Sequence, residues 1–495
     1  MKKVSIIGAG VGGLTTAIYL QKAGFDVTIY EKNDHPGGKM DLIEDSGFKF
    51  DTGPTIVMMP DVYEQPFKDT GVDYRDYFTM ERVNPFMDVL TEGNKFELSS
   101  DLVDIARDFE AYGDGEMLGF LKYLTDIYGK YINAKNNFIY KSFRGPGDFY
   151  NLKTLWQAMR LRTFSTSFKA ISKNIKNTNL QYLMSFQTLY IGISPFNGPS
   201  IYNIIPMIEL IYGIWFIKGG MYEYAKAMAK RFEELGGQIR YESPVDEIVV
   251  KNDKTVAGLR IGQGFESADA VVANADFPYA MESLLGLPDQ KKGKYGKAKV
   301  EKMDYAMSCF MLYLGIDRQY ADLKLHTIKM AKDFEQNVHE IDTGTLPEDP
   351  SFYVYNPSSL DNSFAPSGQT SLYVLVPVAN LKENDNWSDQ MIEDYSEKVI
   401  EKVEKDLALT DLSQHIVVKH VFTPKTFASR YNSLYGTAFG LKPTLMQSNY
   451  FRPHNKDSRL KNLYFAGASV HPGAGVPIVI TSGELAAKEV MRDFK

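Results

Sequence analysis

The chain has 495 residues, of which 44% are hydrophobic and 24% charged, and its formal net charge is −7 at pH 7. This is the composition of an ordinary globular protein, so disordered, collagenous and repeat architectures are excluded. The negative charge argues against a dedicated nucleic-acid binder. A single cysteine, Cys309, excludes a disulfide framework and a thiolate metal cluster. It lies in the strand-like run 308–313, so we expect a buried structural thiol in a reducing, cytoplasmic compartment.

The first 31 residues are predicted to form one βαβ unit. A strand-like run, 4–7, precedes a glycine-rich segment and a helical pattern that begins near Leu14 and closes at Gly24. A second strand, 27–30, follows and ends at Glu31. This order of strand, glycine-rich turn, helix and strand is typical of a dinucleotide-binding fold.

The glycines of this turn have the spacing G-x-G-x-x-G, with Gly8, Gly10 and Gly13 in the three positions. The first permits a tight turn, the second lets the backbone approach a pyrophosphate, and the third lets helix and strand pack closely. The start of the helix offers unpaired N–H groups to phosphates. Glu31 is placed to accept hydrogen bonds from ribose hydroxyls, and its charge disfavours the extra phosphate of NADP.

Two further glycine-rich segments favour FAD over NAD as the dinucleotide. The run Gly-Gly-Lys at 37–39 follows the second strand closely, where a longer cofactor would use it. Near the other end of the chain, the strand-like run 463–465 leads into a glycine-rich turn and a helix from about Ile478. The N-terminus of that helix would stabilise negative charge on a reduced flavin ring.

The region from about 100 to 215 is predicted to be mostly helical and irregular, with unevenly placed charges. Residues 130–176 carry ten basic side chains and one acid, Asp148, whereas 177–216 carry no basic side chain and one acid, Glu209. A basic block is therefore followed by an apolar, aromatic one. The basic residues are Lys130, Lys135, Lys141, Arg144, Lys153, Arg160, Arg162, Lys169, Lys173 and Lys176.

The second half of the chain alternates predicted helices and strands. An amphipathic helix is expected at 222–235, followed by a β-meander of three strands at 245–250, 256–261 and 270–273. A long helix is expected after Ser388, its N-cap. Four further strand-like runs surround that helix in the sequence, at 309–314, 352–355, 372–378 and 415–422.

The predicted fold class is α/β, with a discontinuous Rossmann-like FAD-binding domain, a mixed-sheet substrate domain and a helical membrane-facing subdomain. The FAD-binding domain is expected to comprise 1–80, 220–295 and 425–495. The helical, membrane-associated substrate region is expected at 81–219, and the substrate domain with an antiparallel sheet at 296–424.

Several longer motifs resemble those of the bacterial carotenoid desaturases, the phytoene-type family, and the likeness extends over nearly the whole chain. Besides the N-terminal glycine fingerprint, the matching segments are DTGPT (51–55), TIVMMPDVY (55–63), FQTLYIG (186–192), FIKGGM (216–221), VANAD (272–276), QSNY (447–450) and HPGAGVP (471–477).

The resemblance implies an FAD-dependent oxidoreductase of carotenoid biosynthesis. It implies that dehydrosqualene, a thirty-carbon polyene, loses hydride and proton successively to give 4,4'-diaponeurosporene. Two alternatives share the same FAD motifs: a carotenoid oxidase that forms a terminal aldehyde, and a non-redox, flavin-dependent polyene isomerase. The number of desaturation steps and the choice between thirty- and forty-carbon substrates remain open at this point.

By position in the family's motifs, FAD contacts are expected from the first βαβ unit, from the backbone of Val245 beside the adenine, and from the C-terminal turn. Related flavoproteins often carry an acid where this chain has Ala468. The residues expected to bind FAD are Gly8, Ala9, Gly10, Val11, Gly12, Gly13, Glu31, Lys32, Gly38, Lys39, Val245, Gly467, Ala468 and Val476.

Desaturation needs orientation, an apolar tunnel and an electron sink more than a catalytic dyad. The seven histidines are scattered and none has metal-ligand spacing, so no metal site is expected. His471, beside the C-terminal glycine turn, is the candidate catalytic residue, with a structural role as the alternative. Arg144, Asp148 and Lys153 form a polar group for which we expect a solvated or lipid-facing position.

The expected partners are a long apolar polyene, an anionic membrane surface, and quinone or oxygen as electron acceptor, with no nucleic acid. No run of about 18 uncharged apolar residues occurs, so no spanning helix is predicted. We expect monotopic docking of residues 130–215 on the inner face of the cell membrane, with the tunnel mouth inside the docked area. The alternative is that 204–217 is a buried helix and the basic face is merely solvated.

Overall fold

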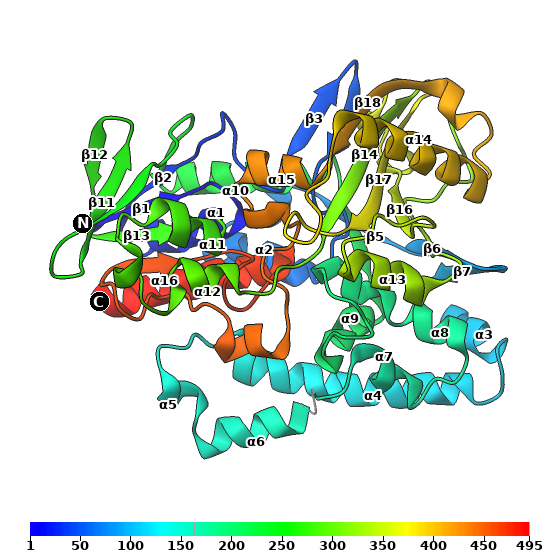
Figure 1. The fold of residues 1–495 in the computed structure, drawn as a ribbon, viewed down its shortest axis with the longest axis horizontal. Coiled ribbons are helices and arrows are strands. Elements are labelled where there is room, and N and C mark those ends of the chain that lie inside the picture. The colour runs from blue at the N-terminus through cyan, green and yellow to red at the C-terminus, as the bar shows by residue number, and fades with distance from the viewer. Residues whose placement is uncertain (162–163, 495) are drawn as a thin grey trace.

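The computed structural model describes residues 1–161 and 164–494. Arg162 of the predicted basic block lies outside the described residues. Two β-sheets dominate the described part of the chain and lie side by side, with a layer of helices along one edge (Figure 1). The predicted α/β class is confirmed.

The dinucleotide half is built on a parallel sheet of five described strands, in the order β19-β13-β1-β2-β9. Every adjacent pair in it is parallel. The central position of β1, directly followed by the glycine turn, sets that turn at the carboxyl edge of the sheet, where α/β folds bind ligands. The strands are β1 (Lys3–Ile7), β2 (Asp26–Tyr30), β9 (Gln238–Arg240), β13 (Ala270–Ala273) and β19 (Leu463–Phe465).

The prediction of a meander ending in 270–273 is wrong. That strand, β13, is buried along its whole length and pairs in parallel with β1 and β19, as a strand covered on both faces does. The antiparallel meander consists instead of β10 (Glu247–Val250), β11 (Val256–Ile261) and β12 (Gly264–Ser267). A short apolar run does not by itself reveal which sheet it joins.

Helix α1 (Val11–Lys22) lies against the dinucleotide sheet and packs against both α10 (Met221–Glu234) and α16 (Val476–Phe494). The approach of α1 to α16 is so close that a Cβ at Gly483 would lie 2.5 Å from the carbonyl oxygen of Gly12. Segments more than 450 residues apart thus meet at the cofactor turn.

The substrate half is built on a mixed sheet of seven described strands, in the order β18-β14-β17-β16-β15-β6-β7. The pair β15–β6 is parallel and the other pairs are antiparallel. Helix α14 (Asp389–Asp406) packs on this sheet, and its predicted N-cap is confirmed, since Ser388 Oγ accepts from Met391 N at 3.3 Å. The strands are β6 (Met87–Thr91), β7 (Asn94–Leu98), β14 (Ser308–Ile316), β15 (His326–Lys329), β16 (Phe352–Tyr355), β17 (Thr370–Val378) and β18 (Ile416–Phe422).

Two of these strands, β6 and β7, come from the region expected to be helical, so the substrate sheet draws on residues before 100. The sheet of the predicted substrate domain, 296–424, thus also contains strands from the predicted helical region, 81–219. The domain boundaries themselves stay a prediction. The remaining strands are β3 (Leu42–Asp45), β4 (Phe48–Asp51), β5 (Met80–Val83) and β8 (Ile214–Ile217). Further helices that surround the sheets are α2 (Pro60–Asp69), α11 (Phe277–Tyr279), α12 (Lys297–Glu301), α13 (Phe334–Asp342) and α15 (Pro424–Tyr431).

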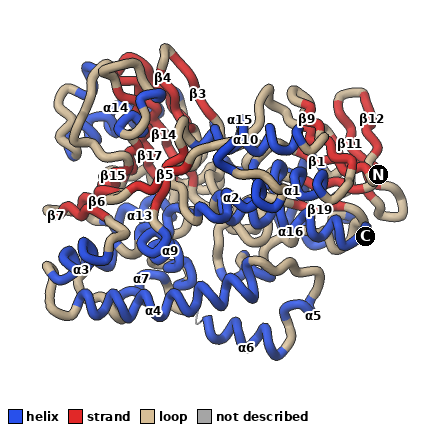
Figure 2. The backbone as a smooth tube through the Cα atoms, turned by 180° about the vertical axis from the view of Figure 1, so that it is seen from behind, coloured by secondary structure: helices blue, strands red, loops and turns tan. Residues whose placement is uncertain are grey.

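The helical region forms the lower layer of the molecule, with α4 to α6 farthest from the sheets in both views (Figures 1 and 2). Among the described residues, no helix combines the length and the hydropathy required to cross a bilayer. The helices are α3 (Leu102–Glu110), α4 (Glu116–Ala134), α5 (Pro146–Phe149), α6 (Leu152–Leu161), α7 (Ser167–Ser172), α8 (Thr178–Leu183) and α9 (Ile204–Tyr212).

The apolar block at 177–216 is largely buried, but the alternative of a single buried helix over 204–217 is wrong, because α9 ends at Tyr212 and 214–217 form the strand β8. The middle of α9, from Pro206 to Leu210, is buried, and Ile211 and Tyr212 at its end are exposed. The most exposed apolar side chains of this region lie instead inside the basic block, at Leu152 (90% exposed) and Phe164 (86%).

Candidate cofactor and substrate site

One cavity of about 510 Å³ extends from the carboxyl edge of the parallel sheet to the mixed sheet. Most of the predicted cofactor-binding residues line it, although they come from both ends of the chain. Ala9, Gly13 and His471 are not part of the lining. The predicted residues that line it are Gly8, Gly10, Val11, Gly12, Glu31, Lys32, Gly38, Lys39, Val245, Gly467, Ala468 and Val476.

Two helix N-termini converge on this cavity. Gly10 is the N-cap of α1, and no side chain of the described residues caps that end. The first residues of α16, Val476 and Pro477, also line the cavity, and the first turns of both helices are free of acids. Uncapped N–H groups and the positive end of the helix dipole make such a cleft suitable for an anionic ligand such as a pyrophosphate.

The glycines at the start of α1 are required by close contacts. A Cβ at Gly13 would lie 2.2 Å from the carbonyl oxygen of Gly8, and one at Gly10 would lie 2.8 Å from Asn274 Oδ1. Gly8 itself has φ = +92°, in the region that favours glycine. The structural reasons given for the three glycines are thus present in the fold.

Asn274 and Asp276 are site residues that sequence reasoning did not select, although their motif was noted. Asn274 follows β13, lines the cavity, and donates from Nδ2 to the carbonyl of Ala466 at 3.0 Å. It joins the N-terminal glycine turn to the C-terminal one. A strand end followed by Asn and Asp at the ligand edge of a parallel sheet was the available signal.

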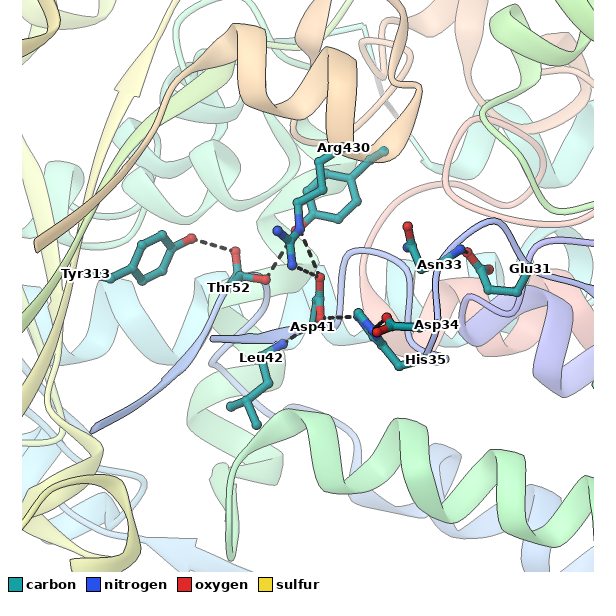
Figure 3. Close-up of polar contacts among 10 residues, drawn as sticks. Glu31, Asn33, Asp34, His35, Asp41, Leu42, Thr52, Tyr313 and Arg430 are labelled. Carbon is teal, nitrogen blue, oxygen red and sulfur yellow. Dashed lines mark hydrogen bonds and ion pairs between the residues drawn. The ribbon is translucent and has the colours of Figure 1, made fainter. Parts of the chain in front are cut away.

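The carboxylate of Glu31 is held by two backbone amides. Its Oε2 accepts from Ala9 N at 2.7 Å and its Oε1 from Asn33 N at 3.0 Å, as Figure 3 shows for Asn33. The N–H of Ala9 is therefore directed at Glu31 rather than at the cavity. Fixed in this way at the end of β2, the carboxylate has acceptor capacity left for hydroxyl groups in the cavity.

Lys39 and Asp276 form a polar group beneath the C-terminal segment. Lys39 Nζ donates to the carbonyls of Thr437 at 3.0 Å and Ala438 at 2.9 Å, and burial lowers its pKa. Asp276 accepts from the hydroxyl of Ser469, while burial raises its pKa and the nearby charge of Lys39 opposes that rise. The opposite charges of Lys39 and Asp276 thus partly offset each other at the cavity.

A second polar group clamps α15 over the glycine doublet at 37–38. Asp41, which is 2% exposed, accepts from Arg430 Nη2 at 2.6 Å and from His35 Nε2 at 2.7 Å. Figure 3 shows Asp41 between the side chains of His35 and Arg430, which come from opposite ends of the chain. Arg430 also lines the cavity, so the clamp is part of the cofactor end of the site.

Three tyrosines of the mixed sheet hold the segment 52–55, which lines the cavity from the dinucleotide side. Tyr313 donates to the carbonyl of Thr52 at 2.9 Å and Tyr373 to that of Gly53 at 3.0 Å. Tyr353 shares a hydrogen bond of 2.8 Å with Thr55 Oγ1. Hydrogen bonds from these tyrosine hydroxyls therefore join the two halves of the molecule beside the cavity that both halves line.

The wall of the cavity on the side of the mixed sheet is mostly apolar. Burial raises the pKa of the Cys309 thiol to about 12, which supports its predicted structural role. Such a wall fits a long hydrocarbon and excludes water. The apolar lining residues on this side include Phe186, Leu189, Met307, Met311, Ile328, Met330, Phe334, Leu375 and Phe439.

His471 lies behind the C-terminal glycine turn, fully buried, with its ring 5.1 Å from that of Phe143. Burial lowers its pKa to about 3, so the ring is neutral. Its backbone carbonyl accepts from Ser482 Oγ at 2.8 Å. These surroundings favour the structural alternative over a catalytic role. Arg452, also fully buried, supports the same turn by donating to the carbonyl of Ala468 at 2.6 Å.

The expectation of a solvated or lipid-facing Arg144 is wrong. Its guanidinium forms an ion pair with the buried Glu489 and a second with Asp493 at 2.9 Å, both on α16. Asp148 Oδ2 accepts from Arg144 N at 2.8 Å. The two ion pairs hold the segment between α4 and α6 against the C-terminal helix. Lys153, by contrast, is exposed as expected.

The family model of the flavin containing amine oxidoreductases matches residues 11–491. The chain is 42% identical to a protein of Staphylococcus haemolyticus named 4,4'-diapophytoene desaturase (4,4'-diaponeurosporene-forming), over 99% of each chain. It is 41% identical to a protein of the same name from Staphylococcus aureus, over 100% of this chain and 99% of the other.

Solved structures with the same fold include an oxidoreductase from Methanosarcina mazei, with TM-score 0.62 and 16% identity over 99% of this chain and 100% of the other. Another is putrescine oxidase, with TM-score 0.63 and 12% identity over 99% of each chain. At these identities the likeness supports the fold alone.

Proposed function

This chain belongs to the flavin-containing amine oxidoreductase family, with FAD as cofactor, and from that premise we propose that it desaturates 4,4'-diapophytoene (dehydrosqualene) to 4,4'-diaponeurosporene. The observation that carries the proposal is the single cavity that joins a dinucleotide cradle to an apolar wall. The full-length likeness to the staphylococcal desaturases indicates the substrate.

The residues of the cradle fit the cofactor. We assign the uncapped N–H groups of α1 to the pyrophosphate, the fixed carboxylate of Glu31 to a ribose, and the backbone of Val245 to the adenine. The turn at 467–468 and the N-terminus of α16 would lie along the flavin. When bound, FAD supplies the acceptor for the hydride that leaves the polyene.

The apolar wall supplies orientation and the exclusion of water. Removal of an allylic hydride leaves a cation that the polyene delocalises, and an adjacent C–H then loses a proton to complete the new double bond. A wall of aromatic and aliphatic side chains holds the reacting carbons in place without competing for that cation as a nucleophile. Successive cycles lengthen the conjugated system.

The proposal is tested in a bacterial host that carries only a dehydrosqualene synthase and this gene. We expect a yellow thirty-carbon pigment whose mass is lower by successive pairs of hydrogens, which also counts the steps. An extract with dehydrosqualene alone would contradict the proposal. An aldehyde formed from preformed diaponeurosporene would indicate the oxidase, and isomerised polyene of unchanged mass would indicate the isomerase.

For the delivery of the substrate, we propose that α6 and its flanks dock on the cytoplasmic face of the membrane. Trp156 and Met159 are 58% and 60% exposed on this outer helix; its first residue, Leu152, and Phe164, which follows the helix in sequence, are also exposed. Lys153 and Arg160 on the same helix would add attraction to anionic lipids, about 1 kcal/mol each. Exposed apolar side chains beside basic ones are typical of interfacial helices.

Docking is tested by co-sedimentation with anionic vesicles. The double variant Trp156→Glu, Met159→Glu should lose most of its binding, and neutralising Lys153 and Arg160 should weaken it. Phe265→Glu is the matched control, because this half-exposed aromatic side chain lies on β12, far from α6 (Figure 1). Equal binding of all variants would contradict the proposal.

The final electron acceptor is proposed to be quinone or oxygen, because the sequence has a single dinucleotide fingerprint, at 8–13. Reoxidation of the substrate-reduced enzyme by a soluble quinone under anaerobic conditions would support quinone. Reoxidation by oxygen alone would support the other acceptor.

A further inference from the structure

Three polar side chains linked by hydrogen bonds, Thr55, Tyr353 and His326, interrupt the apolar wall of the mixed sheet. The hydroxyl of Tyr353 on β16 lies 2.8 Å from Thr55 Oγ1 and 2.7 Å from Nδ1 of His326 on the neighbouring strand β15. Tyr353 and Thr55 line the cavity, whereas His326 lies behind them with no accessible surface. The hydroxyl of Tyr353 thus connects the cavity to a buried imidazole.

The surroundings of His326 keep its ring neutral and give it few hydrogen-bond partners. The ring stacks between Tyr353 and Tyr355, with centroid distances of 5.9 Å and 5.5 Å. Burial lowers the pKa of His326 to about 3. Its Nε2 has no hydrogen-bond partner in the described part of the chain, so Tyr353 is the polar group to which the structure ties this base.

The other polar side chains of this wall are committed or unsuitable as bases. Tyr373 donates its proton to the carbonyl of Gly53, and Cys309 is a protonated thiol because its pKa is raised. Tyr190 directs its hydroxyl at the sulfur of Met87, 3.8 Å away, and also interacts with the buried carboxyl of Glu209, which is protonated because burial raises its pKa to about 8. A hydroxyl linked to a neutral imidazole is therefore a distinctive feature of Tyr353 on this wall.

We propose that the Tyr353 hydroxyl accepts the proton that the polyene loses in each desaturation, and that His326 positions this hydroxyl and takes its proton. The inference rests on the proposed function. One C–H bond gives its hydride to FAD, and the adjacent C–H bond gives its proton to Tyr353 Oη as the double bond forms. The proton already on Oη passes to Nδ1 of His326, whose own proton is then on Nε2.

A weak base suits this step, because the polyene cation is a strong acid and needs a correctly placed acceptor rather than a basic one. Burial disfavours the imidazolium that forms, so the proton returns through Tyr353 to the cavity when product leaves. The chain is then ready for the next cycle.

The test compares Tyr353→Phe with Tyr355→Phe in FAD-loaded protein supplied with dehydrosqualene in vesicles. Both variants keep an aromatic ring beside His326, but Tyr355 does not line the cavity. We expect Tyr353→Phe to slow single-turnover product formation about a hundredfold without changing half-saturation. A cation that lives longer can lose the wrong proton, so isomeric polyenes should appear by chromatography. Tyr355→Phe should keep the normal rate and a single product.

His326→Asn provides the intermediate case, because its amide can still bind Tyr353 but is not basic. We expect a slower reaction with by-products, while the FAD content and melting temperature stay normal. Normal rates and clean product from Tyr353→Phe would overturn this inference and leave the proposed function standing. Failure of the unmodified enzyme to desaturate dehydrosqualene would overturn both.

Discussion

The two ends of the cavity recognise their ligands by different parts of the chain. At the dinucleotide end, glycine turns and helix N-termini present backbone N–H groups, and the side chains that matter, such as Glu31 and Asp41, are held by backbone amides or ion pairs. At the substrate end, side chains from distant strands form an apolar wall crossed by tyrosine hydroxyls. Binding through backbone N–H groups requires glycine at particular positions, whereas binding of a hydrocarbon requires an apolar surface of suitable shape.

The largest expected effect comes from Gly13→Ala. Its Cβ would lie 2.2 Å from a backbone oxygen that cannot move without separating α1 from β1. We expect purified protein without visible flavin absorbance and without desaturase activity. Gly129→Ala is the control, because this exposed glycine on α4 has open space around it, and helix propensity predicts a gain of about 0.5–1 kcal/mol. Retention of flavin by Gly13→Ala would show that the cradle tolerates displacement.

Asp41→Asn tests the clamp over the glycine doublet. The loss of charge-assisted hydrogen bonds to Arg430 and His35 should lower the free energy of unfolding by about 2 kcal/mol and weaken FAD retention on gel filtration. Asp34→Asn should change little, because Asp34 is exposed and contacts the outer side of the same His35 ring. If both variants behave alike, the clamp does not contribute to cofactor retention.

Glu209→Gln tests the substrate side through the pH dependence of stability. Burial raises the pKa of Glu209 to about 8, above its unfolded value of about 4.3. Between these values the folded protein holds a proton that the unfolded chain has lost, so stability falls as pH rises, by about 1.4 kcal/mol per pH unit. The variant should lose this slope, leaving the similar contribution of Asp51, whose pKa burial raises to about 7. Denaturant titrations across the window measure it, and equal slopes would contradict the assignment.

The smallest effect is expected from Tyr313→Phe, which removes one bond between the two halves. Loss of the hydrogen bond to Thr52 should cost at most about 1 kcal/mol of stability. FAD content should be unchanged, because Tyr313 lies outside the cavity lining. A marked loss of FAD would mean that the joint between the halves also shapes the cradle.

This difference between the two ends explains which features could be predicted from the sequence. Gly8, Gly10 and Gly13 were recognisable because a Cβ at two of them would meet a neighbouring atom, so few other residues can stand there. Asn274 carries no comparable signature, since its role depends on the proximity of two glycine turns. The pairing of Tyr353 with His326 depends on the register of β15 and β16, which local sequence does not encode.

The same limit applies to the fold. Long amphipathic patterns such as α10 and α14 were predicted well, because their periodicity is local. The short run 270–273 was assigned to the wrong sheet, because the sheet that a short buried strand joins is decided by tertiary contacts.

The position of β19 and α16 has a consequence for the biosynthesis of the protein. During translation, β13 emerges long before β19, its neighbour in the parallel sheet, so one sheet edge stays unpaired until residues 463–465 have left the ribosome. Unpaired edges are prone to association with other chains. The nascent chain also lacks the second of the two helix ends that face the cavity, so stable flavin capture awaits the last segment.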